Sequence, residues 1–196
     1  MEKRDIPNAI CWGRIALIPF VLLFMIPSLI TEALTYKTSV MIAGIIFAVA
    51  MISDFVDGKI ARKYNYTTNL GKFLDPLADK ALVLSVCIAV TSIEHFSSLV
   101  TWCTILILLR ELLVTGLRLS AASKGSVVAA NWWGKIKTAL QGVTLVTTFV
   151  CLYLGEACDG IAYIYTIPEI LFAITAVYTC ISAIPYIKAC APYLKG

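Results

Sequence analysis

Long apolar segments alternate along the chain with short stretches of charged and polar residues. A helix that crosses the hydrocarbon core of a bilayer needs about 20 mostly apolar residues. Six segments approach this length, at about residues 10–30, 38–56, 77–93, 97–117, 136–155 and 169–187. The pattern therefore predicts an all-α, polytopic membrane protein with six transmembrane helices. Because the connections between the segments are short, we expect residues 1–196 to form a single integral membrane domain.

Prolines interrupt the first and last of these segments, at Pro19, Pro27 and Pro185. Proline removes a backbone N–H and crowds the preceding turn, which membrane helices tolerate where neighbouring helices satisfy the freed carbonyls. The sequence therefore predicts kinks in the first and sixth helices.

The basic residues divide unevenly between the two ends of the predicted helices. If the N-terminus lies inside, every Lys and Arg except Lys37 falls on the inner side. The outer connections then carry Lys37 and five acidic residues: Glu32, Glu94, Glu156, Asp159 and Glu169. Since cytoplasmic loops carry an excess of Lys and Arg, we expect a multi-pass protein of the cell membrane with both termini cytoplasmic. Some inner cations are most simply helix anchors or attractors of anionic lipid, namely Lys3, Arg4, Lys63, Lys188 and Lys195.

The composition agrees with a membrane protein, because 60% of the residues are hydrophobic, 14% are charged and the mean hydropathy is +0.87. These values exclude a water-soluble globule. The 7 cysteines form no C-x-x-C pair, which argues against a disulfide framework or a zinc site and favours packing roles. The single histidine, His95, lies beside Glu94 in a polar connection, which disfavours histidine-based catalysis. We expect no nucleic-acid partner.

Four aspartates lie at the end of the second apolar segment and the start of the third. Asp54 and Asp57 are three residues apart, and Asp75 and Asp79 are four apart, so each pair would share one face of a helix. Like charges this close repel one another, and charge is costly at a membrane. Mg²⁺ or Mn²⁺ would compensate them, because hard cations prefer oxygen ligands and four carboxylates suit two ions. The pattern predicts a two-metal site for phosphoryl or phosphatidyl transfer.

The alternative is that these aspartates form solvated ion pairs with neighbouring cations, namely Lys59, Arg62, Lys72 and Lys80. Two pairs at helical spacing, each with a glycine nearby, favour the metal site instead. Gly58 and Gly71 would let a phosphate or a flat ring approach the backbone closely. A divalent-cation transporter would also place carboxylates in helices, but transport sites are expected near the bilayer midplane rather than at helix ends.

The spacing of these residues resembles the signature of the CDP-alcohol phosphotransferase family. The signature reads D-x-x-D-G-x-x-A-R, a gap of eight residues, then G-x-x-x-D-x-x-x-D. Its defined positions are filled by Asp54, Asp57, Gly58, Ala61, Arg62, Gly71, Asp75 and Asp79. The resemblance implies a six-helix membrane enzyme, usually a homodimer, that moves a substituted phosphate from a CDP-linked donor to an alcohol and releases CMP. By the same resemblance, the four aspartates surround two metal ions and Asp79 is also the general base. The cytidine and pyrophosphate site would be lined by Asp57, Gly58, Ala61, Arg62 and Gly71.

Four further cations lie at the inner ends of the fourth and fifth segments, and we call them the acceptor cations: Arg110, Arg118, Lys135 and Lys137. Arg110 and Arg118 are eight residues apart, near two helical turns, so they would share a face. Arginine offers planar donors and lysine a point charge, which together suit the phosphate of an anionic acceptor. The alternative is a basic rim in which Arg110 pairs with Glu111.

Residues 5–19, 109–118 and 131–138 narrow the resemblance to family members that use CDP-diacylglycerol and sn-glycerol 3-phosphate. In the first of these segments, Asn8 and Arg14 would line the donor site, although Cys11 stands where related sequences commonly carry Thr. Arg14 would otherwise extend to the membrane interface. Family members that use inositol phosphate, or phosphatidylglycerol as in cardiolipin formation, are the nearest alternatives. We expect the active site on the cytoplasmic side.

Overall fold

The computed structural model describes residues 6–26, 34–64, 69–123, 132–157 and 162–194, and within these the side chains of 6–11, 54–64, 69–79, 122–123, 162 and 191–194 are outside the description. All regular structure in the described residues is helical. The elements are α1 (Ile6–Met25), α2 (Tyr36–Tyr64), α3 (Asn69–Val90), α4 (Ser98–Ser123), α5 (Trp132–Ala157), a short 3₁₀ helix η2 (Ala162–Tyr165), α6 (Thr166–Ile181) and α7 (Ile184–Leu194). The all-α prediction is confirmed for this part of the chain.

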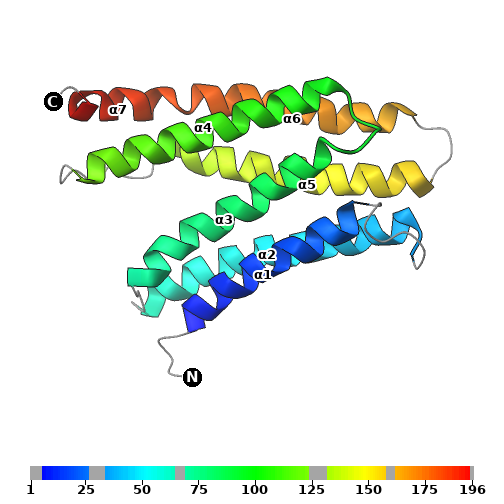
Figure 1. The fold of residues 1–196 in the computed structure, drawn as a ribbon, viewed down its shortest axis with the longest axis horizontal. Coiled ribbons are helices and arrows are strands. Elements are labelled where there is room, and N and C mark those ends of the chain that lie inside the picture. The colour runs from blue at the N-terminus through cyan, green and yellow to red at the C-terminus, as the bar shows by residue number, and fades with distance from the viewer. Residues whose placement is uncertain (1–5, 27–33, 65–68, 124–131, 158–161, 195–196) are drawn as a thin grey trace.

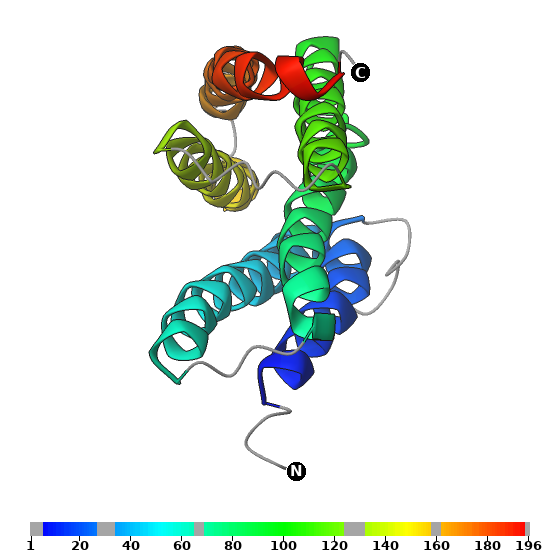
Figure 2. The same ribbon diagram turned by 90° about the vertical axis from the view of Figure 1, so that its left-hand side faces the viewer.

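The long helices lie side by side and alternate in direction, as short connections require (Figure 1). α1 packs against both α2 and α3, α4 packs against α6 and α7, and α5 packs against α2 and α6. α2 and α4 end, and α1, α3 and α5 begin, at the left-hand end of the view in Figure 1. We call this the motif end, because it is where α2 ends and α3 begins. Figure 2 looks at this end, with α1 to α3 below and α4, α6 and α7 above.

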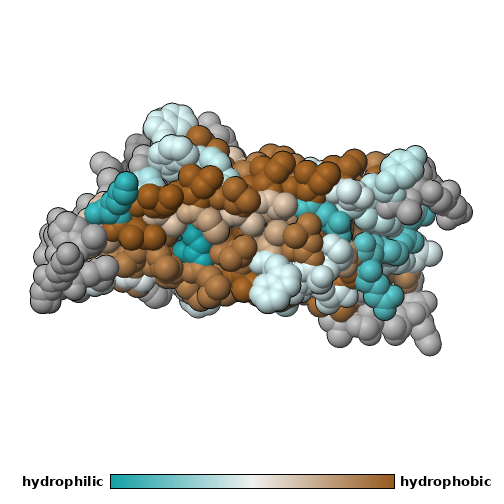
Figure 3. Space-filling view, turned by 90° about the horizontal axis from the view of Figure 1, so that it is seen from above, coloured by the Kyte–Doolittle hydropathy of each residue, from teal (hydrophilic) through white to brown (hydrophobic). Residues whose placement is uncertain are grey.

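A continuous apolar core joins the helices. It is built from fully buried side chains such as Phe47, Leu82 and Phe172, and the rings of Phe47 and Phe149 lie 5.5 Å apart between α2 and α5. The outward faces are apolar as well, and Leu112 of α4 is 62% exposed. Figure 3 shows a mostly hydrophobic surface with the hydrophilic residues nearer its two ends. A surface of this kind suits a lipid environment, in which exposed apolar side chains carry no hydration cost.

Four helical stretches are long and apolar enough to cross a membrane: Tyr36–Ser53, Ser98–Ala121, Trp132–Ala157 and Tyr163–Cys190. Two shorter apolar helical stretches, Trp12–Met25 and Lys80–Val90, belong to α1 and α3. Within the described residues, each of the six apolar segments of the sequence is therefore mostly helical. By length and composition, four of them meet the requirement for a span within the described residues.

The last apolar segment is broken into α6 and α7 at Ser182 and Ala183. The Pro185 ring would crowd the carbonyl of Ile181 in a continuous helix, and proline has no N–H to donate. At the break, the Ser182 hydroxyl donates to the Thr179 carbonyl at 2.8 Å. This interruption agrees with the kink predicted at Pro185, whereas α1 continues through Pro19. Pro27 lies outside the described residues.

The described cysteines are free thiols. Four of them are buried, namely Cys87, Cys103, Cys151 and Cys190, whereas Cys180 is exposed. The packing interpretation therefore holds for the buried four, while Cys11 and Cys158 lie outside the described side chains.

Candidate active site at the motif end

The aspartate motif lies on two helices that reach the motif end together. The last turns of α2 carry Asp54, Asp57, Gly58, Ala61 and Arg62, and the first half of α3 carries Gly71, Asp75 and Asp79. The backbone is helical at all of these positions, so each aspartate pair lies about one turn apart on its helix. α1 packs against both helices. The side chains of these eight residues are outside the description, and their roles stay predictions.

Arg14 lies within this first group of helices. It belongs to α1, and its side chain is 3% exposed. A side chain that extended to the membrane interface would be far more exposed. The burial of Arg14 therefore disagrees with extension to the membrane interface, and its role in the donor site stays a prediction. Asn8 lies on the same helix, with its side chain outside the description.

Lys80 joins the motif helix α3 to α4. Its Nζ donates to the Thr115 hydroxyl at 2.6 Å. Lys80 directly follows Asp79, so the bond fixes α4 beside the second aspartate pair. α4 runs towards the motif end (Figure 1), so Arg118 lies three residues, about one helical turn, nearer that end than Thr115.

Lys135 lies on the first turn of α5, which begins at the motif end (Figure 1). Seven residues after it on α5 comes Gly142, where an added Cβ would lie 3.1 Å from the Met51 Cε of α2. Residues seven apart share a helix face, so Lys135 is on the side of α5 that packs against α2. Because α2 and α5 are antiparallel (Figure 1), seven residues towards the motif end from Met51 is Gly58. Lys135 and Arg118 are both exposed.

The side chain of Arg110, the third acceptor cation, is buried and forms hydrogen bonds within the protein. Its Nε donates to the Thr179 carbonyl at 3.1 Å, and its Nη2 donates to the Ser182 hydroxyl at 2.8 Å and the Ser182 carbonyl at 3.4 Å. The guanidinium also lies 5.8 Å from the centre of the Tyr186 ring of α7. Arg110 is 8% exposed and satisfies carbonyls that the break between α6 and α7 leaves without helical partners.

Glu111 connects Arg110 with Lys137, the fourth acceptor cation. Its Oε1 accepts from Arg110 Nη1 at 3.3 Å and from the Lys137 ammonium. Glu111 is 4% exposed and Lys137 is 6% exposed. The structure therefore separates the acceptor cations into a buried pair held by Glu111 and an exposed pair, Arg118 and Lys135. The pairing of Arg110 with Glu111 that the sequence offered as an alternative is present. Phosphate binding by any of the four stays a prediction.

Sequence reasoning did not place Glu111 in the site. A signal was available, because an acidic residue inside an apolar membrane segment is costly and usually has a partner or a function. A second signal separates the two lysines, since Lys135 and Lys137 are two residues apart and must face nearly opposite sides of a helix.

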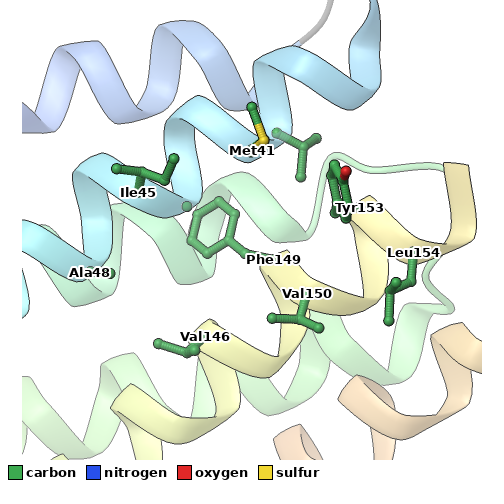
Figure 4. Close-up of a pocket in the computed structure, with 10 residues that line it drawn as sticks. Met41, Ile45, Ala48, Val146, Phe149, Val150, Tyr153 and Leu154 are labelled. Carbon is green, nitrogen blue, oxygen red and sulfur yellow. The ribbon is translucent and has the colours of Figure 1, made fainter. Parts of the chain in front are cut away.

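An apolar groove between α2 and α5 has a volume of about 330 Å³ (Figure 4). Its walls are Val40, Met41, Gly44, Ile45, Ala48, Val146, Phe149, Val150, Tyr153 and Leu154. The two helices come close here, as the position of Gly44 shows: an added Cβ at Gly44 would lie 3.2 Å from the Phe149 Cβ. Its lining suits hydrocarbon and offers no charge to a pyrophosphate, so the groove is distinct from the motif end.

Aspartate pairs on two helices and cations at the same end of an apolar helical protein are the arrangement that the sequence predicts for a membrane-embedded transferase acting on phosphate esters. Residues 4–181 match the family model of the CDP-alcohol phosphatidyltransferases, and the chain belongs to this family.

The curated relatives carry a more specific name, CDP-diacylglycerol–glycerol-3-phosphate 3-phosphatidyltransferase. The protein of this name from Bacillus subtilis is 44% identical over 142 residues, which are 70% of this chain and 72% of that protein. The Rickettsia typhi protein is 37% identical over 190 residues, 97% of this chain and 99% of that protein. The Salmonella typhimurium protein is 35% identical over 191 residues, 94% of each. The family resemblance predicted from the motif is confirmed.

Proposed function

We propose that this protein transfers the phosphatidyl group of CDP-diacylglycerol to sn-glycerol 3-phosphate, which gives phosphatidylglycerol phosphate and CMP. The observation that carries the proposal is the similarity to curated enzymes of that name over nearly the whole chain, 97% in the Rickettsia typhi protein. The filled aspartate motif and the two exposed cations near the same end of the helices, Arg118 and Lys135, support the same reaction.

For the membrane arrangement, we propose six spans with both termini and the active site on the cytoplasmic side of the cell membrane. The start of α1 and the end of α7 lie at the same end of the bundle (Figure 1), which also carries the motif. All Lys and Arg residues except Lys37 belong to this end by the sequence pattern. The donor's acyl chains would then stay in the bilayer while its headgroup reaches the motif. A homodimer is implied by the family resemblance and remains part of the proposal.

The carboxylates that would hold two Mg²⁺ or Mn²⁺ ions are Asp54, Asp57, Asp75 and Asp79. The donor set fits, because carboxylate oxygens are the ligands these ions prefer and the backbone sets each pair one turn apart on helices that α1 holds together. Bound there, such ions supply charge neutralisation for the pyrophosphate and the transferring phosphorus.

The remaining steps of the proposed reaction use this chain's own side chains. Arg118 and Lys135 hold the phosphate of the acceptor, and Asp79 takes the proton of the acceptor's 1-hydroxyl. That oxygen attacks the β-phosphorus of the donor, and the bond from this phosphorus to the CMP oxygen breaks. The nucleotide is held by Asp57, Gly58, Ala61, Arg62 and Gly71, with Asn8 and Arg14 beside it.

An acceptor panel tests the proposal. The purified protein in detergent receives CDP-diacylglycerol, a divalent metal and one acceptor at a time: glycerol 3-phosphate, glycerol, inositol phosphate or phosphatidylglycerol. We expect CMP release and a new phospholipid with glycerol 3-phosphate and none with glycerol, because the exposed cations bind a phosphate that glycerol lacks. Comparable rates with inositol phosphate or phosphatidylglycerol would contradict the choice of acceptor and leave the family assignment intact.

A further inference from the structure

α4 presents a row of polar side chains along one face. Glu111, Thr115 and Arg118 are spaced by four and three residues, so they follow one another on the same side of the helix. Glu111 accepts from Lys137 of α5, and Thr115 accepts from Lys80 of α3. Arg118 is the last of the row and lies nearest the motif end. The row therefore fixes α4 against two other helices immediately before it reaches the exposed cation.

Glu111 carries the connection to α5. Within the described residues, α4 packs mainly on α6 and α7, whereas α5 packs mainly on α2 and α6. The ion pair of Glu111 with Lys137 thus joins two helices that share α6 as a packing partner and otherwise pack against different helices. Lys137 lies two residues from Lys135 on α5. The Glu111–Lys137 ion pair therefore also fixes the position of α5 along its axis, and with it the position of Lys135.

The charge balance makes this contact sensitive to a single substitution. One buried carboxylate faces two buried cations, and the Glu111 Oε1 atom accepts from both. Removing a partner from a buried ion pair leaves an uncompensated charge, which the surrounding structure relieves only by moving or by admitting water. Without the Glu111 charge, the Lys137 ammonium and the Arg110 guanidinium would repel each other and α5 would shift from α4.

We propose that Glu111 is a positioning residue for the acceptor: by holding Lys137 and Arg110, it sets the separation of Arg118 on α4 from Lys135 on α5. This inference rests on the proposed function, in which these two exposed cations bind the acceptor phosphate. Glu111 lies on α4, whereas the motif proposed to bind the donor lies on α2 and α3. Its loss should therefore affect the acceptor and leave the use of CDP-diacylglycerol unchanged.

The test measures both KM values and kcat for Glu111→Gln, with CDP-diacylglycerol and glycerol 3-phosphate as the varied substrates. We expect the KM for glycerol 3-phosphate to rise about tenfold, the loss of roughly one charge-assisted hydrogen bond, while the KM for CDP-diacylglycerol stays within about twofold. The control is Thr144→Val, which removes the buried Thr144–Thr175 hydrogen bond of 2.7 Å between α5 and α6. It should lower thermal stability and change neither KM.

The double variant Glu111→Gln with Lys137→Gln separates positioning from direct binding by Lys137. Two facing amides remove the unpaired Lys137 charge, and Arg110 keeps its Thr179 and Ser182 acceptors, so we expect the double variant to fold and to recover most of the acceptor KM even if Glu111→Gln alone fails to fold. No recovery would mean that the Lys137 charge itself contacts the acceptor and would overturn the proposal. An unchanged acceptor KM in folded Glu111→Gln, or an equal rise in Thr144→Val, would overturn it as well. Absence of turnover by the wild type with glycerol 3-phosphate would instead refute the proposed function.

Discussion

Replacing Arg118 with Ala removes one of the two exposed cations proposed to hold the acceptor phosphate. The side chain is exposed on α4, three residues beyond Thr115 towards the motif end. Surface substitutions of this kind usually change the free energy of unfolding by less than about 0.5 kcal/mol. The effect should therefore appear in substrate binding and leave folding intact.

The size of the effect follows from the lost contact. A hydrogen bond to a charged group contributes about 1.5–3 kcal/mol. Since about 1.4 kcal/mol corresponds to a factor of ten, the KM for glycerol 3-phosphate should rise roughly 10- to 150-fold. Arg118→Lys should recover only part of this loss, because an ammonium cannot reproduce the paired donors of a guanidinium.

Steady-state kinetics with both substrates varied, together with thermal unfolding in detergent, measure these outcomes. The KM for CDP-diacylglycerol should stay close to the wild-type value. Lys188→Ala is the matched control, since Lys188 is an exposed cation on α7 that the sequence indicates as a membrane anchor. An acceptor KM within about twofold of wild type in a folded Arg118→Ala protein would refute the reasoning, and so would an equal rise in Lys188→Ala.

Three further outcomes are expected. Asp75→Asn should lower the rate of CMP release about 100-fold or more in a protein with wild-type thermal stability, because transition-state charge stabilisation is lost; a residual rate above about one tenth of wild type would contradict metal ligation by Asp75. Arg110→Met should lower the free energy of unfolding by about 1–3 kcal/mol, because it leaves the Thr179 and Ser182 carbonyls at the end of α6 without their donor while Glu111 keeps Lys137; an unchanged thermal transition would contradict that role. Gly44→Val should cost about 1–3 kcal/mol by forcing α2 away from Phe149, whereas Gly116→Ala, where an added Cβ meets nothing within 4 Å, should not destabilise, and equal melting shifts in the two variants would contradict the packing argument.

The sequence predicted the helices well because the need to satisfy backbone hydrogen bonds in lipid leaves few alternatives to a helix. The hydropathy segments stopped short of the polar extensions of these helices, although the spacing of the aspartate pairs predicted helix there. α2 continues to Tyr64, beyond the apolar segment that ends near residue 56, and α3 begins at Asn69, before the apolar segment that begins near residue 77. Hydropathy reports contact with lipid, whereas a helix forms wherever its backbone can bond to itself. The aspartate motif occupies these extensions, so a hydropathy reading alone does not reveal that it is helical.

The direction in which a charged side chain faces was harder to predict. The sequence places Arg110 on one helix face with Arg118, and Lys137 at the same end of its helix as Lys135, but burial depends on how α4 and α5 are rotated about their axes. That rotation is set by distant partners, such as the Thr179 carbonyl and the Tyr186 ring that surround Arg110. No local pattern near residue 110 specifies a break 72 residues later in the chain.

The packing of α1 with α2 and α3, and of α4 with α6 and α7, has a consequence for how enzymes of this kind diversify. Under the proposed function, the part of the reaction common to all CDP-linked donors lies in the first three helices, and the part that distinguishes one alcohol from another lies on α4 and α5. A lineage could then exchange its alcohol through substitutions in the second half of the chain while the first half stays under constant selection. Hybrid chains joined in the connection between α3 and α4 should inherit their alcohol preference from the second parent.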